Sequence, residues 1–215
     1  MNATPNLERS LRYLMAWAPA VEAAKTTLSQ RAVPDAALHA GTLSFQAQST
    51  FGQLLGSTSV VTGAVVGAHD LTTARGWVEA TVATFGTGGG RRDRALREAL
   101  EIERHPTIHF SLRGTTVVSV SLGARDVTTV LLHGALTVRG TTRRTELPAT
   151  ITRTAAITRV TSAFPLDLAD YGVDGVRRML GFIRVNPVIQ VRVNLWFVDR
   201  LLAVSDDERA ERRQA

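Results

Sequence analysis

The sequence predicts a mainly β protein, in which about eight or nine antiparallel strands form a barrel, with one short helix inserted between strands and a helical extension at the N-terminus. Alternating apolar and polar residues recur in runs along most of the chain, and short turns rich in glycine separate these runs. No strand-helix-strand repeat typical of an α/β fold interrupts them. Closing the sheet removes the two exposed edges of an open meander, so a barrel is favoured.

Composition supports one domain with a packed interior. The chain has 215 residues, of which 44% are hydrophobic, enough for a sizeable core. It contains no cysteine, which excludes disulfides, thiolate metal sites and cysteine nucleophiles. The net charge is +6, but the arginines are spread over many segments, and so no nucleic-acid partner is expected.

The chain is predicted to have three parts. Residues 1–40 form a helix and a linker, residues 41–200 form the barrel, and residues 201–215 form a charged tail. In the first part, apolar residues share one helical face from Leu7 to about Thr27. This helix either packs on the outside of the domain or acts as a lid, a partner-binding helix or an anchor on a membrane surface.

The N-terminal segment also bears on localisation. The apolar run from Tyr13 to Val21 is similar to a weak signal peptide, but it is short, and Pro19 and Glu22 end it quickly. A retained helix, and with it a cytoplasmic location, is slightly favoured over a periplasmic or secreted one. No run reaches the roughly 18 apolar residues that a membrane span needs, so no membrane-spanning helix is expected.

The predicted inserted helix lies within residues 91–110. Glycines precede it, and Asp93 is an acceptor suited to capping the first helical turn. Apolar residues then recur at helical spacing over residues 94–103. Pro106 switches the pattern to the period of two that is typical of a strand, so the helix is short and a strand follows it.

The predicted strands follow one another along the rest of the chain. They cover residues 43–51, 57–67, 77–85, 108–110, 115–122, 128–138, 145–153, 155–168 and 188–198. Most have one apolar face, which is typical of strands with one buried side. Residues 140–144 are predicted to form a polar bend and residues 170–184 a loose connection.

Several motifs, in a fixed order, resemble the YceI-like family. The segment RRDRAL…ERHPTIHF, residues 91–110, is similar to the family's Arg-Asp pair, the leucine after it, the His-Pro and the Ile-x-Phe strand. The other matching pieces are Leu43-Ser-Phe45, Gly56, Gly63, Val78-Glu-Ala80-Thr-Val82, Gly134-Ala-Leu136-Thr-Val138-Arg-Gly140 and Pro165-Leu-Asp-Leu-Ala-Asp-Tyr171-Gly172. The resemblance covers about residues 40 to 200. One departure is Leu100-Glu-Ile102-Glu, where the family usually has two aromatic residues before the His-Pro.

The resemblance implies a lipocalin-like barrel that binds, carries or stores an isoprenoid lipid with a polyprenyl or quinone-type tail. The inward candidates are all apolar: Phe45, Phe51, Val65, Val78, Val82, Ile108, Phe110, Leu136, Val138, Phe164, Leu166, Val191, Val193 and Leu195. The residues alone leave open whether these side chains fill a closed core or line a tunnel, and the resemblance favours the tunnel. Arg91 and Arg92, beside the helix N-terminus, are the candidates for contact with a head group.

No catalytic or metal site is expected. The loop at residues 86–90 lacks the Gly-Lys-Ser/Thr of a phosphate loop, and no Gly-x-Ser-x-Gly motif occurs. His105 and His109 are four residues apart, but Pro106 prevents the helix that this spacing would need for a shared metal. We therefore expect a non-enzymatic lipid-binding protein with no cofactor beside its ligand. The alternative is a closed-barrel scaffold protein that binds a partner through its N-terminal helix.

Other partners follow less directly from the sequence. The positive net charge favours peripheral contact with an anionic membrane, and a homodimer is a further option. Neither has a motif of its own. The isoprenoid lipid that the resemblance implies is therefore the first expected partner.

Overall fold

The computed structural model describes residues 34–50, 52–121, 126–154, 157–173 and 185–199. The expected N-terminal helix, the charged tail and Phe51 lie outside these described residues. Among the described residues, no helix combines the length and the apolar character needed to cross a bilayer.

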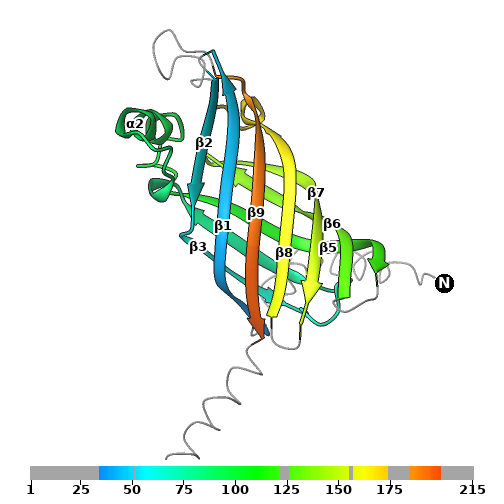
Figure 1. Cartoon of the computed structure of the whole chain (residues 1–215). Coiled ribbons are helices and arrows are strands. Elements are labelled where there is room, and N and C mark those ends of the chain that lie inside the picture. The colour runs from blue at the N-terminus through cyan, green and yellow to red at the C-terminus, as the bar shows by residue number, and fades with distance from the viewer. Residues whose placement is uncertain (1–33, 51, 122–125, 155–156, 174–184, 200–215) are drawn as a thin grey trace, which may run out of the picture. The chain divides into compact units, whose positions relative to one another are not determined.

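The described residues form one antiparallel sheet of nine strands that closes on itself (Figure 1). The strands are β1 (Ala36–Ser49), β2 (Gly52–Thr58), β3 (Val61–Val66), β4 (Arg75–Thr81), β5 (Thr107–Ser121), β6 (Asp126–Val138), β7 (Thr141–Arg153), β8 (Ile157–Asp167) and β9 (Val188–Asp199). The first and last strands close the ring, from Ala36 opposite Asp199 to Gln46 opposite Gln190. Eight strands make the barrel and β2 is an extra strand beside β1, so the predicted antiparallel barrel is confirmed.

Several expected strand boundaries were wrong, two of them because the ladder continues where the apolar pattern stops. β1 begins at Ala36, inside the segment that was predicted to be linker. The expected strands at residues 108–110 and 115–122 are one strand, β5, whose pairing with β6 shifts between Leu112 and Gly114. A bulge of this kind moves the alternation by one residue, and so one strand has the pattern of two.

The predicted bend at residues 140–144 was also wrong. β6 and β7 are joined by only two residues, Arg139 and Gly140, with φ of 47° and 72°. Positive φ at both central residues is the geometry of a type I′ turn, whose twist matches that of the strands it joins. Thr141 to Arg144 therefore belong to β7.

The inserted helix, α2 (Gly90–Ala99), lies between β4 and β5 as predicted, but it does not begin as predicted. Its N-cap is Gly89, whereas Asp93 lies inside the helix. The Asp93 carboxylate accepts hydrogen bonds from the backbone N–H and the hydroxyl of Thr87, at 2.7 and 2.6 Å. These bonds, chiefly that from the Thr87 hydroxyl, lower the pKa of Asp93 and fold the glycine-rich loop back onto the helix.

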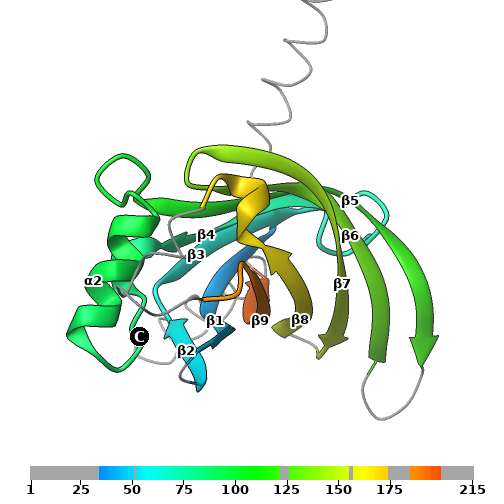
Figure 2. The same ribbon diagram turned by 90° about the horizontal axis from the view of Figure 1, so that it is seen from above.

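Two short 3-10 helices complete the described elements. η1 (Val82–Thr84) follows β4, so the strand predicted for residues 77–85 ends at Thr81. η2 (Leu168–Tyr171) follows β8 and ends at Gly172, whose φ is 71°. The Asp-Tyr-Gly motif therefore forms a turn, and Tyr171 is buried among apolar side chains, which raises its pKa. Seen from above, α2 and the far ends of β5 and β6 lie on opposite sides of the barrel (Figure 2).

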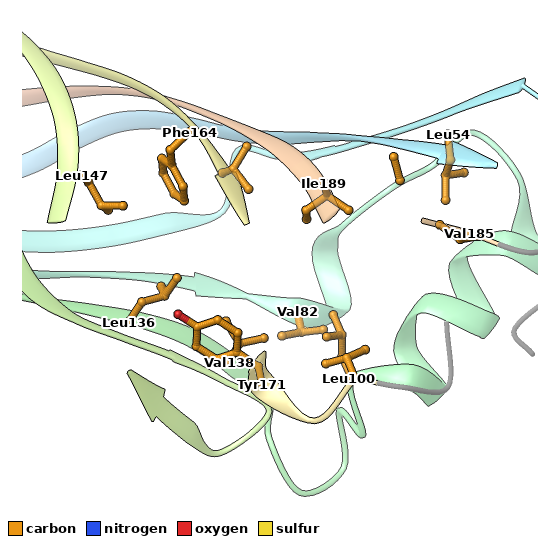
Figure 3. Packing of buried hydrophobic residues seen from close by; sticks show 13 residues of the cluster. Leu54, Val82, Leu100, Leu136, Val138, Leu147, Phe164, Tyr171, Val185 and Ile189 are labelled. Atoms are coloured by element: carbon orange, nitrogen blue, oxygen red, sulfur yellow. The ribbon is translucent and has the colours of Figure 1, made fainter. Parts of the chain in front are cut away.

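The hydrophobic core lies inside the barrel. Figure 3 shows Leu136 pointing from one wall toward Phe164 and Ile189 on the facing wall. The same cluster continues to Leu100, directly after α2, and to Val82 in η1. The helix end of the barrel is thus closed by apolar residues that follow the strands.

A polar contact joins three loops at this end. The Arg139 guanidinium donates hydrogen bonds to the carbonyl of Gly172 and to the carboxylate of Glu101. All three residues have positive φ, and in Glu101 and Arg139 this backbone conformation is strained because they carry side chains. The hydrogen bond from Arg139 is the main cause that lowers the pKa of Glu101. We name these three residues the Arg139 latch.

The latch predicts a stability change that depends on pH. Arg139→Ala removes the donor shared by two loops, and we expect Tm to fall by about 3–6 °C at pH 7. The folded-state pKa of Glu101 lies below its unfolded value of about 4.3, so its contribution is present above that pH and is lost as pH falls through the folded pKa. The difference in Tm between wild type and variant should therefore shrink below about pH 4. Thermal melts at pH 7 and pH 3.5 measure it.

Arg104→Ala is the matched control. Arg104 also lies near the Glu101 carboxylate, at 3.6 Å, but its side chain is 77% exposed. Exposed ion pairs contribute little, so this variant should melt within about 1–2 °C of wild type. Equal losses of Tm in the two variants would contradict the role given to Arg139.

Candidate functional site

The barrel encloses two adjoining cavities. One has a volume of about 150 Å³ and lies against the β3–β4 loop, with Ala68, Leu71 and Ala74 in its lining. The other has a volume of about 100 Å³ and lies against α2, with Leu96 and Ala99 in its lining. We name them the loop-end chamber and the helix-end chamber. They are at opposite ends of the barrel and follow one another along its interior.

The two chambers meet at a waist. Four residues line both of them: Leu43, Ile108, Leu136 and Phe164. These side chains come from β1, β5, β6 and β8, so the waist is formed by strands from around the barrel. Leu136 and Phe164 are each 7% exposed, so they are buried where the two chambers meet.

Nearly all of the predicted inward residues line these chambers. Those in the loop-end lining are Val65, Val78, Ile108, Phe110, Leu136, Phe164, Val193 and Leu195. Those in the helix-end lining are Phe45, Ile108, Leu136, Val138, Phe164, Leu166 and Val191. Val82 lines neither chamber because it lies in η1 and is packed in the core, where it is 1% exposed. Phe51 lies outside the described residues.

The free space is small and apolar. A 150 Å³ cavity lined by leucine, isoleucine and phenylalanine remains dry and holds a group of about the size of benzene. Each chamber, as it stands, therefore accommodates roughly one five-carbon unit. Among the described residues, those that line the helix-end chamber all have hydrocarbon side chains, so none of them offers water or a polar group a hydrogen-bond partner.

Two phenylalanine rings keep the chambers open by lying over glycines of neighbouring strands. A β-carbon at Gly56 would lie 2.4 Å from the ring of Phe45, and one at Gly134 would lie 2.5 Å from the ring of Phe110. Because both glycines lack that carbon, each ring fits against the wall instead of projecting into the interior. The glycines thus set how much of the barrel stays hollow.

The loop-end chamber has one charged residue in its lining, Arg153, among the described residues. It is the last residue of β7, two positions after the inward-facing Ile151. Its guanidinium donates one hydrogen bond to the carbonyl of Ala68 and another to that of His69, the latter at 3.3 Å. Sequence analysis missed Arg153, although it continues the inward period of two that begins at Leu147.

Six other lining residues were not among the inward candidates predicted from the sequence. They are Leu43, Leu132, Leu147, Ile151, Val160 and Phe197. Each lies an even number of positions from a predicted inward residue of its own strand, or directly opposite an inward-facing residue of the neighbouring strand. Counting along the strands in this way would have included them.

The arginines proposed for a head group lie elsewhere. Arg91 and Arg92 are exposed on the first turn of α2 and line neither chamber. The Arg92 side chain instead lies against Gly89, since a β-carbon there would be 3.1 Å from its Nε. Their role as head-group contacts therefore gains no geometric support from the described residues.

The histidines take part in surface contacts. His109 stacks on Trp77 and lies 3.5 Å from the carboxylate of Glu79. His133 contacts Thr116 through Nε2 at 2.7 Å and a glutamate through Nδ1. No group of three or more metal-binding side chains gathers in the described part of the chain.

Comparison with known proteins gives a family. The model of the YceI-like domain matches residues 24–197. A polyisoprenoid-binding domain from Saccharophagus degradans, implicated in plant cell wall breakdown, has a similar fold, with a TM-score of 0.66 and 14% identity over 78% of this chain and 99% of that one. BcnA from Burkholderia cenocepacia is also similar, with a TM-score of 0.62 and 14% identity over 73% of this chain and 95% of that one.

These matches differ in what they show. At this identity the two solved structures show the fold alone, and a comparison with curated proteins finds no match. The family match, by contrast, spans most of the chain and includes every strand that forms the two chambers, up to Phe197 in β9. The protein therefore belongs to the YceI-like family.

Proposed function

We propose that this protein binds an isoprenoid lipid non-covalently inside the barrel and carries or stores it. The observation that supports this most is the pair of apolar chambers joined at the waist. A tail with a repeating five-carbon unit suits an interior of this form, because most of the described side chains that line it are hydrocarbon. The polyisoprenoid-binding domain from Saccharophagus degradans, which shares the fold, supports the same ligand class.

Removal of the tail from water supplies the binding free energy. Each buried methylene contributes about 0.8 kcal/mol, so a five-carbon unit contributes roughly 4 kcal/mol before the cost of association. A tail of more than about two units exceeds the free volume of the chambers, and it has to displace side chains at the waist. Leu136 and Phe164 are two of the side chains that lie there.

The chemistry of the linings favours binding over catalysis. Their polar residues among those described are Arg153, Thr115, Thr158 and Ser162, all in the loop-end chamber. An acid-base reaction needs a titrating group placed against a partner, and hydroxyls beside one arginine do not form such a pair. We therefore propose a binding protein without enzymatic activity.

Extraction of the purified protein tests the ligand class. Organic extraction followed by mass spectrometry is expected to give a long-chain isoprenoid in a molar ratio near one. Fatty acyl chains alone in the extract would overturn the proposed ligand. An empty interior, together with oligomers that depend on residues 1–40, would instead favour the scaffold alternative.

A charge in the loop-end lining should abolish uptake. Phe110→Asp places a carboxylate among apolar side chains with no partner, and we expect either unfolding or loss of the bound lipid. Circular dichroism and lipid content per protein measure the two outcomes. Val118→Asp, on the same strand but 65% exposed, is the control and should fold and load normally. A folded Phe110→Asp protein with full lipid content would show that residue 110 does not face the ligand.

A single methyl group should shorten the ligand that fits. In Gly56→Ala the new β-carbon lies 2.4 Å from the Phe45 ring, whose atoms are its three nearest neighbours, so the ring has to turn into the helix-end chamber. We expect roughly tenfold weaker binding of farnesol, with three isoprene units, and a smaller loss for geraniol, with two. Titration with both alcohols measures this. Adding Phe45→Leu should restore farnesol binding, and equal losses for the two alcohols would argue against the chamber limiting tail length.

A further inference from the structure

We propose that Arg153 binds an anionic, phosphate-type head group of the lipid and so orients the ligand with its head at the loop end and its tail toward α2. This inference rests on the proposed function and adds the chemistry and the direction of the ligand. It differs from the expectation from sequence, which placed the head group at Arg91 and Arg92, near the opposite end.

The position of Arg153 is the first reason. The inward side of β7 carries Leu147, Ala149 and Ile151, which are buried, and Arg153 continues that side at the end of the strand. Its side chain lines the loop-end chamber and is partly exposed. A cation at the end of an apolar stripe has access both to the interior and to water, which is where the head of a lipid with a buried tail must lie.

The hydrogen bonds of Arg153 are the second reason. A guanidinium has five N–H donors in a planar fork. Two of them are used by the carbonyls of Ala68 and His69, which fix the side chain against the β3–β4 loop. The others have no hydrogen-bond partner among the described residues, so a donor set already held in place remains available to a ligand.

The charge around Arg153 is the third reason. Nearby carboxylates have other contacts: Asp35 accepts from the N–H of Ala68 at 3.1 Å, and Asp199 lies 3.2 Å from His69. Asp126 is opposite Arg153 in the β6–β7 ladder, yet the two form no ion pair in the described structure. A cation without a bound carboxylate beside an apolar chamber favours an anionic oxygen, and a guanidinium matches phosphate in both charge and geometry.

The test compares two ligands with the same tail. Farnesyl phosphate and farnesol differ only in the head group, so their affinity ratio isolates its contribution. We expect the wild-type protein to prefer farnesyl phosphate roughly 10- to 100-fold, and Arg153→Met to lose that preference while it still binds farnesol. Arg153→Lys, which retains the charge without the fork, should keep only part of the preference.

Two control variants remove arginines elsewhere. Arg159→Met removes a cation on the next strand that contacts Asn194 and the ring of Trp196 on the outer face. Arg91→Gln with Arg92→Gln removes the cations on α2. Both should retain the full preference for the phosphate.

The outcomes separate the inference from the function on which it rests. If both ligands bind but the preference survives in Arg153→Met, or is lost in the Arg91 and Arg92 variant instead, the head group does not lie at Arg153. Equal weakening of both ligands in Arg153→Met and Arg153→Lys would mean that Arg153 only holds the β3–β4 loop, which also overturns the inference. If neither ligand binds the wild-type protein, the proposed function fails together with it.

Discussion

The ladder between β1 and β9 is the constraint on which the rest of the structure depends. It places Leu43 opposite Val193 and Phe45 opposite Val191, and directly opposed residues share one face of a sheet. A shift of one residue would turn every one of these side chains outward, so the apolar alternation itself fixes the register. Gly41 takes part too, because a β-carbon there would lie 2.8 Å from the side chain of its partner Leu195.

Closure alone does not make a binding site, because an eight-stranded barrel is narrow enough for its own side chains to fill. The interior stays hollow here because large and small residues are paired across strands. Phe45 lies over Gly56 and Phe110 over Gly134, so two of the largest inward side chains occupy space beside the wall rather than on the axis. At the waist, by contrast, the side chains of Leu136 and Phe164 belong to the linings of both chambers and separate one from the other.

Sequence analysis could predict the fold class and the inward face of most strands because both follow from alternation. It could not predict features that depend on how distant segments meet. The bulge after Leu112 shifts the apolar alternation, so the single strand β5 was predicted as two strands. Asp93 was predicted to cap the helix, because its actual hydrogen-bond partner, Thr87, is brought to it only by the path of the loop. The free volume of the barrel could not be predicted from the sequence either, since it depends on the orientations of the phenylalanine rings. Arg153 was accessible in principle, as a charged residue in phase with an apolar stripe.

The two ends of the barrel differ in the kind of group that they can hold, and this difference gives the interior a direction. At the helix end every described residue of the lining has an apolar side chain, and the Arg139 latch outside it is satisfied by Glu101 and Gly172. At the loop end the guanidinium of Arg153 has donors to spare beside hydroxyls such as that of Thr158. A tail gains the same free energy per methylene in either orientation, whereas a polar head would lose its hydrogen bonds at the helix end. Hence the head group, rather than the tail, decides the orientation of a bound lipid.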